Sequence, residues 1–120
     1  PLSLQVRGMR STDDPELSLQ RNVSEAFDSC IRRLDALYED ARHAAPHDFR
    51  ERITFWRDAC GLPEAVHARM QTLRIWRNAS DHHDSERWAR AGPRSAEEAS
   101  AVIRSIDVVI DNFEGQRRGE

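Results

Sequence analysis

Apolar residues recur every three to four positions in four separate stretches of the chain, and this spacing restricts the fold more than any other feature. The period matches the turn of an α-helix, so each stretch has one apolar face that must pack against another element. No stretch of useful length alternates between apolar and polar residues, as a half-buried strand would. We therefore expect an all-α protein folded as an up-and-down four-helix bundle. The four apolar faces lie within residues 19–38, 49–60, 66–73 and 99–113.

Capping and helix-breaking residues mark the ends of the predicted helices. The clearest start is Ser95, which together with Glu98 matches the capping box S-x-x-E. The segment before it, from about Asp84 to Arg94, is expected to be the longest loop. We predict a loose N-terminal arm over residues 1–13, the bundle over 14–115 and a C-terminal tail over 116–120. The helices are expected from Asp14 to about Ala44, from Asp48 to Gly61, from Leu62 through Arg77 and from Ser95 to Gly115.

The charge of the chain is slightly acidic but unevenly distributed. The 120 residues are enough for one domain with a modest core, and their net charge is −3. This balance excludes a globally basic nucleic-acid binder. Residues 69–94, however, hold six arginines against three acidic residues, while residues 95–120 hold three arginines against six acidic residues. We therefore expect a local basic patch around the end of the third helix and the loop after it.

The sequence shows no feature that would attach the chain to a membrane. No apolar run approaches the roughly 20 residues that a membrane-spanning helix needs, and no signal peptide is visible. The two cysteines, Cys30 and Cys60, fall in apolar faces, so we interpret them as buried thiols of a protein in the reducing cytoplasm. The chain begins with Pro1, which indicates processing or a piece of a longer parent protein.

The end of the third predicted helix carries side chains suited to phosphodiester chemistry. In the string L-R-I-W-R-N-A-S-D-H-H-D, Arg74, Asn78 and His82 follow one another at intervals of four residues and share one helix face. Arg77 lies a step round, at the edge of the apolar face. A guanidinium can hold phosphate oxygens, an imidazole can move a proton near neutral pH, and an amide can hold either partner. No metal or other cofactor is needed when the nucleophile is the 2′-hydroxyl of RNA.

The string R-N-x-x-x-H, formed by Arg77, Asn78 and His82, resembles the R-x(4–6)-H motif of the HEPN superfamily. Members of this superfamily are small four-helix bundles in which a polar residue, often Asn, follows the arginine. The position late in the third of four helices is similar as well. A tyrosine two residues after the histidine, found in one version of the motif, is replaced here by Asp84.

This resemblance has functional implications. It implies a homodimer whose two motifs face each other across a cleft. It also implies metal-independent endoribonuclease activity, with Arg77, Asn78 and His82 as the catalytic residues. Other members of the superfamily bind RNA or nucleotides without cutting them, and some are partners of nucleotidyltransferases in toxin–antitoxin pairs.

The segment after the motif extends the predicted RNA-binding surface. Trp88 has two interpretations, contact with a base or a partner and anchoring of the loop, whereas Trp56 is expected in the core. Trp76 is expected in the core or in a dimer interface. The predicted RNA-binding residues are Arg74, Arg87, Trp88, Arg90 and Arg94.

Two other kinds of site receive little support from the sequence. His82, His83 and Asp84 are not expected to hold a metal, because adjacent helical residues point about 100° apart. Neither cysteine is near a histidine, and no G-x-S-x-G motif is present. The main alternative to RNA binding or cleavage is therefore a non-catalytic module for dimerisation or protein interaction within a larger protein. The acidic net charge favours this alternative.

Overall fold

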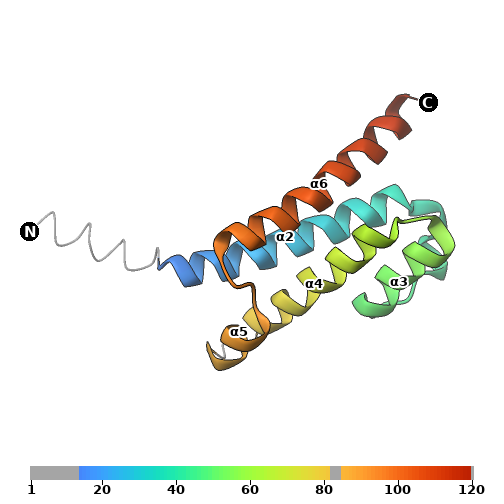
Figure 1. Ribbon diagram of the computed structural model, residues 1–120. Coiled ribbons are helices and arrows are strands. Elements are labelled where there is room, and N and C mark those ends of the chain that lie inside the picture. Colours follow the sequence, from blue (N-terminus) through green and yellow to red (C-terminus); the bar gives the residue numbers. More distant parts are fainter. Residues whose placement is uncertain (1–13, 82–84, 120) are drawn as a thin grey trace, which may run out of the picture.

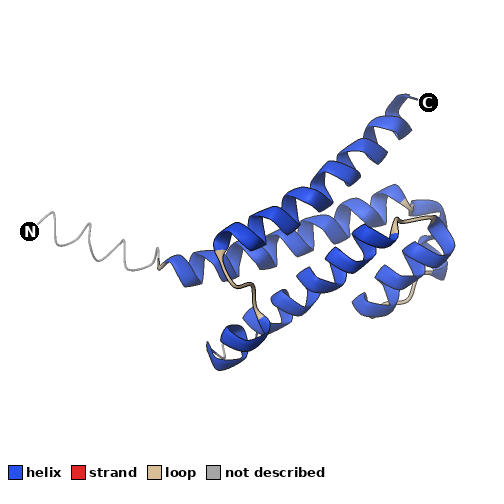
Figure 2. Ribbon diagram, viewed as in Figure 1, coloured by secondary structure: helices blue, strands red, loops and turns tan. Residues whose placement is uncertain are grey.

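The computed structural model describes residues 14–81 and 85–119, and every regular element within these ranges is helical. The all-α prediction is therefore confirmed for the described part of the chain (Figures 1 and 2). The described residues form six helical elements instead of the four predicted. The elements are α2 (Pro15–Leu37), the 3₁₀-helix η2 (Glu39–Ala44), α3 (Phe49–Cys60), α4 (Glu64–Asp81), α5 (Ser85–Ala91) and α6 (Ala96–Gly119).

The first helix begins as predicted but is shorter than predicted. The Asp14 carboxylate accepts a hydrogen bond from the backbone N–H of Glu16 at 2.8 Å, and Pro15 occupies the first turn. The α-helix ends at Leu37, and the chain tightens into η2 where we expected it to continue to about Ala44. None of the η2 residues is buried, so no packing supports a longer α-helix there.

Local signals fix both ends of α3. The Asp48 side chain accepts a hydrogen bond from the backbone N–H of Glu51 at 3.0 Å. Gly61 follows the helix with φ of 85°, a left-handed conformation that a glycine adopts without strain. The predicted ends at Asp48 and Gly61 are therefore confirmed. The turn at Gly61 also sends α4 back along α3, so these two helices form an antiparallel hairpin.

The last helix starts at the predicted capping box and ends later than predicted. The Ser95 hydroxyl accepts a hydrogen bond from the N–H of Glu98 at 3.0 Å, and the Glu98 carboxylate accepts one from the N–H of Arg94 at 2.7 Å. We expected Gly115 to end the helix, but α6 continues to Gly119. Gly115 has no positive φ, and the Arg117 guanidinium, two residues later, donates a hydrogen bond to the backbone carbonyl of Leu37. This contact ties the last turns of α6 to the end of α2.

The three longest helices form the main body of the protein. Helices α2, α4 and α6 pack against one another, and α3 packs on α4 (Figure 1). The Phe27 ring of α2 and the Phe49 ring of α3 meet edge to face at 5.3 Å, so α3 also contacts α2. The largest fully buried side chains are Trp56, Phe27, Leu34, Ile53, Met70, Leu73, Ile106, Ile110, Val23 and Val66. All but Ile110 belong to the four predicted apolar faces; in α6 the sequence pattern predicts Val109 on the buried face, whereas the neighbouring Ile110 is fully buried.

The segment predicted as a long loop contains helix α5. Trp88 is the buried residue of this helix, only 5% exposed, and it packs against the main core. The backbone N–H of Gly92 donates to the carbonyl of Trp88 at 2.8 Å and closes the helix. A helix of seven residues with one large apolar side chain has no visible period, which explains why the sequence pattern missed it.

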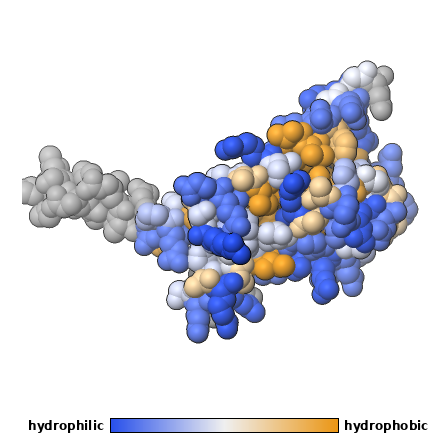
Figure 3. Space-filling model, viewed as in Figure 1, coloured by the Kyte–Doolittle hydropathy of each residue, from blue (hydrophilic) through white to orange (hydrophobic). Residues whose placement is uncertain are grey.

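None of the helices in the described part of the chain combines the length and the apolar character of a membrane-spanning segment. The surface seen in Figure 3 is mostly hydrophilic, and apolar side chains gather where α6 passes over the bundle.

Candidate functional site

The end of α4 carries the first two residues of the predicted motif. Arg77 and Asn78 lie in the last turns of this helix. His82 lies outside the described residues, as does His83. The geometry of the candidate site is therefore built from Arg77, Asn78 and their neighbours in the described ranges.

The side chain of Arg77 points toward α2 and α3. Its guanidinium carbon lies 5.6 Å from the centre of the Phe27 ring and 5.7 Å from that of Phe49. Cations at such distances from an aromatic face are attracted by the negative face of the ring. Only 24% of the Arg77 side chain is exposed. Arg77 is therefore held against two aromatic rings that connect α4 with α2 and α3.

Two carboxylates compensate the charge of Arg77. Its Nε lies 3.3 Å from an oxygen of Asp28 on α2, and its Nη1 lies 3.2 Å from an oxygen of Asp81 on α4. The Asp28 contact is within ion-pair distance but lacks hydrogen-bond alignment, since the buried Nε has no hydrogen-bond partner among the described residues. The positive charge of Arg77 is therefore offset by two carboxylates of the same chain.

Asn78 lies on a different side of α4. It lines a hollow of about 300 Å³ between α4 and α5 together with Arg87. The remaining walls are apolar, formed by Ile75, Ala79 and Ala91. Ile75 is 44% exposed, which is high for a large aliphatic side chain. The structure thus brings Asn78 and Arg87 together from two helices, and Arg77 does not line this hollow.

Arg74, one turn before Asn78, faces the beginning of α3. Its Nε donates a hydrogen bond to the side-chain oxygen of Gln71 at 2.7 Å. The pKa of Arg74 is lowered, first by burial and then by the neighbouring positive charge of Arg50, while Asp48 acts in the opposite direction. Arg74 and Arg50 therefore form a basic pair between α4 and α3, separate from Arg87 in the hollow.

The other predicted RNA-binding residues are spread over two places. Trp88 and Arg94 line a hollow of about 400 Å³ that also includes Pro15 and Leu19 of α2. Because the Trp88 side chain is buried, the structure favours anchoring over stacking on a base. Arg90 is exposed at the end of α5. These residues therefore do not gather into one patch with Asn78.

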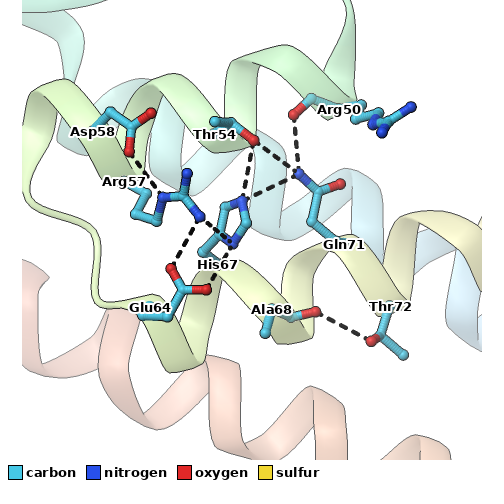
Figure 4. A network of polar contacts seen from close by, with 9 residues as sticks. All are labelled: Arg50, Thr54, Arg57, Asp58, Glu64, His67, Ala68, Gln71 and Thr72. Carbon is cyan, nitrogen blue, oxygen red and sulfur yellow. Dashed lines mark hydrogen bonds and ion pairs between the residues drawn. The ribbon is translucent and has the colours of Figure 1, made fainter.

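A polar network connects α3 and α4 near the turn of the hairpin. The Nε2 atom of His67 lies 3.1 Å from the hydroxyl of Thr54, and its Nδ1 lies 3.6 Å from the Glu64 carboxylate (Figure 4). Arg57 contacts the same carboxylate at 3.1 Å. Among the described residues, no three His, Cys, Asp or Glu side chains are placed to hold a metal ion. We interpret the network as a set of polar contacts that holds α3 against α4.

Sequence reasoning missed Arg50 and Gln71, although the hairpin could have indicated them. The Gln71 side chain donates to the backbone carbonyl of Arg50 at 3.0 Å (Figure 4). In an antiparallel hairpin that turns at Gly61, residues at equal distances from the turn lie opposite each other. Positions near 50 therefore face positions near 71 to 74, and this symmetry places Arg50 beside the predicted site.

Comparison of the chain with known proteins gives no matching family model, no matching curated protein and no matching solved structure. The function of the chain is therefore inferred from the motif and from the geometry around α4.

Proposed function

We propose that this domain is an HEPN-like module that binds RNA or a nucleotide at the end of α4. The observation that carries the proposal is the hollow shared by Asn78 and Arg87. A guanidinium recognises phosphate oxygens, an amide can pair with a base edge, and the apolar walls suit the flat face of a base. The volume of about 300 Å³ lies at the lower end of the range for small-molecule sites.

In this proposal Arg77 acts as a positioning residue for binding. Its contacts with Phe27 and Asp28 hold α4 against α2, and its ion pair with Asp81 supports the last turn of the helix. Asn78 lies in this last turn, so the contacts of Arg77 also hold Asn78 at the wall of the hollow. The arrangement supports binding without cleavage more than cleavage, because two carboxylates already offset the charge that a transition state would need.

Metal-independent cleavage is the second form of the proposal, and it rests on His82. In this form His82 exchanges a proton with the 2′-hydroxyl or with the leaving oxygen, and Arg77 has to leave at least one of its carboxylates to reach the phosphate. The products then carry a 2′,3′-cyclic phosphate. The HEPN resemblance also implies a homodimer, in which two α4 ends share one cleft.

The competing function is a non-catalytic module for dimerisation or protein interaction. The observation that favours it is the same pairing of Arg77 with Asp28 and Asp81, together with the net charge of −3. The two functions differ in their response to RNA, so a direct binding measurement separates them.

The test is fluorescence anisotropy with a 5′-fluorescein-labelled, single-stranded RNA of mixed sequence, at two salt concentrations. We expect binding that weakens as salt rises. Asn78→Ala and Arg87→Ala should weaken it, while Arg69→Ala is the matched control. Arg69 is exposed on the same helix, nine residues before Asn78, and therefore on the opposite face. Absence of RNA binding in low salt would overturn the proposal and favour the interaction module.

Cleavage is tested separately, by incubating the same RNA with the protein in EDTA. The catalytic form predicts cleavage with cyclic-phosphate ends, lost by about 10²- to 10⁴-fold in His82→Ala. His83→Ala is the control, because the neighbouring position on a helix points about 100° away. Binding without any cleavage would establish the non-cleaving form.

A further inference from the structure

Arg50 at the beginning of α3 and Arg74 in α4 form a basic pair near the Asn78–Arg87 hollow. The two helices are antiparallel, and their connection through Gly61–Pro63 places Arg50 opposite Gln71 and Arg74. In Figure 4 the side chain of Arg50 extends past Gln71, in the direction in which α4 runs from Glu64 to Gln71. Two arginines that are distant in sequence are thus neighbours in the fold.

Gln71 fixes both partners of this pair. Its side-chain nitrogen donates to the backbone carbonyl of Arg50 at 3.0 Å, and its side-chain oxygen accepts from Nε of Arg74 at 2.7 Å. Each end of the amide is therefore used, which sets its orientation. The Nε contact holds the plane of the Arg74 guanidinium and leaves its two Nη groups for another acceptor.

Within residues 14–81 and 85–119, no carboxylate lies within ion-pair distance of either arginine of the pair. Unlike Arg33, Arg52, Arg57 and Arg77, neither Arg50 nor Arg74 forms an ion pair with another described residue. Burial and the charge of Arg50 both lower the pKa of Arg74, and the charge of Asp48 offsets this only in part. An anion between the two guanidinium groups would relieve their repulsion.

The basic pair is aligned with the hollow. Gln71, Arg74 and Asn78 are three and four residues apart and therefore share one face of α4. The step from Arg74 to Asn78 is about 6 Å along the helix axis, at 1.5 Å per residue. A chain of linked phosphates can follow such a face, whereas a single nucleotide in the hollow would leave the arginine pair unused.

We infer that Arg50 and Arg74 bind the phosphate adjacent to the nucleotide held at the Asn78–Arg87 hollow, so that the ligand is single-stranded RNA of at least two nucleotides. This inference rests on the proposed function and specifies its ligand. Arg50 and Arg74 form one subsite, Asn78 and Arg87 form the next, and Gln71 positions the first.

The experiment compares the labelled single-stranded RNA with uridine 5′-monophosphate as an unlabelled competitor, using Arg50→Ala and Arg74→Ala. Arg50→Ala removes the side chain that carries the guanidinium but keeps the backbone carbonyl to which Gln71 donates. Arg69→Ala again serves as the control on the opposite face of α4. Thermal unfolding followed by circular dichroism checks that each variant folds, and Arg50→Ala alone suffices for the test if Arg74→Ala does not fold.

We expect each of the two variants to weaken RNA binding and to reduce the slope of log affinity against log salt by about 0.7, the value for one phosphate contact on a single strand. The monophosphate should compete poorly with the RNA for the wild-type protein, because it cannot fill both subsites. The control should keep both the affinity and the slope of the wild type.

Three outcomes would overturn the inference. If Arg50→Ala and Arg74→Ala bind like the wild type while Asn78→Ala and Arg87→Ala bind weakly, the second subsite does not exist although the proposed function stands. If Arg69→Ala weakens binding as much as the other two, the effect is non-specific charge. If the wild type binds no RNA, the proposed function fails and the inference fails with it.

Discussion

Arg77 and Asn78 are adjacent in the chain, yet they face different parts of the structure. The Arg77 guanidinium lies 5.6 Å from the centre of the Phe27 ring, inside the contact of α4 with α2, whereas Asn78 lines the hollow shared with α5. Two residues of one motif therefore have different physical roles. Arg77 holds the helix in place, and Asn78 is available to a ligand.

The first prediction separates these roles by stability. Arg77→Ala removes the ring contacts and leaves Asp28 and Asp81 without their cation, so it should lower the free energy of unfolding by about 1–3 kcal/mol. Asn78→Ala, at an exposed position, should change it by less than about 0.5 kcal/mol. Urea unfolding of both variants provides the measurement. Equal stability of the two variants would show that the ring and carboxylate contacts of Arg77 contribute nothing.

The second prediction concerns the contact of α2 with α6. The Arg33 guanidinium binds Asp107 at 3.1 Å and Glu114 at 2.9 Å, and it also contacts Asp111. Its hydrogen bond to Glu114 holds the pKa of that carboxyl below the ordinary value. These groups are partly exposed, so Arg33→Ala should cost only about 1 kcal/mol or less at neutral pH.

The pH dependence follows from the direction of this shift. A carboxyl whose pKa is lower in the folded state stabilises the fold above its unfolded-state pKa. That contribution disappears as the pH falls through the folded-state pKa. The difference in unfolding free energy between the wild type and Arg33→Ala should therefore shrink from neutral pH toward about pH 3. A difference that stays constant or grows on acidification would contradict the role of Glu114.

The third prediction concerns the two thiols. Burial, with a smaller contribution from the charge of Asp107, raises the pKa of Cys30 to about 12. Cys60 is only partly buried and lines a hollow with Tyr38 and Phe113. In the native protein at about pH 8, Ellman's reagent should therefore modify Cys60 first and reach Cys30 only after unfolding. In Cys60→Ser the rapid reaction should be absent, and fast modification of Cys30 there would show that α2 opens readily.

The fourth prediction uses a pair of glycines. A Cβ atom at Gly92 would lie 2.6 Å from the backbone oxygen of Trp88 and 2.9 Å from its ring, so Gly92→Ala must shift α5. We expect a loss of about 1–3 kcal/mol in unfolding free energy and a change in tryptophan fluorescence. Gly115→Ala is the matched control, because nothing lies within 4 Å of its Cβ. That helical site should become more stable by about 0.5–1 kcal/mol. Unchanged stability of Gly92→Ala would contradict the packing of α5 on Trp88.

The parts of the fold that could be predicted from sequence are those set by local chemistry. The cap at Asp48, the left-handed Gly61 and the capping box at Ser95 act within a few residues, and each lies where the sequence places it. The missed features depend on contacts between distant segments. Helix α5 is held by a single buried tryptophan, and the end of α6 is held by the bond from Arg117 to the carbonyl of Leu37.

In the candidate site, too, features set by local sequence could be predicted and features set by contacts between distant segments could not. Helical spacing alone puts Arg74 and Asn78 on one face of α4. It does not reveal that Arg77 meets Asp28, because that ion pair spans two helices far apart in sequence. The neighbour of Arg74, by contrast, follows from the symmetry of the α3–α4 hairpin, so Arg50 could have been found once the turn at Gly61 was recognised.

The most direct measurement of ligand binding at the end of α4 is a titration of ¹⁵N-labelled protein with the single-stranded RNA, followed by amide chemical shifts. We predict that the largest shifts fall on Ile75, Asn78 and Arg87 around the hollow and extend to Arg50 and Arg74. Shifts gathered instead at the opposite end, around Tyr38 and Phe113, or no shifts at all, would contradict RNA binding at the end of α4.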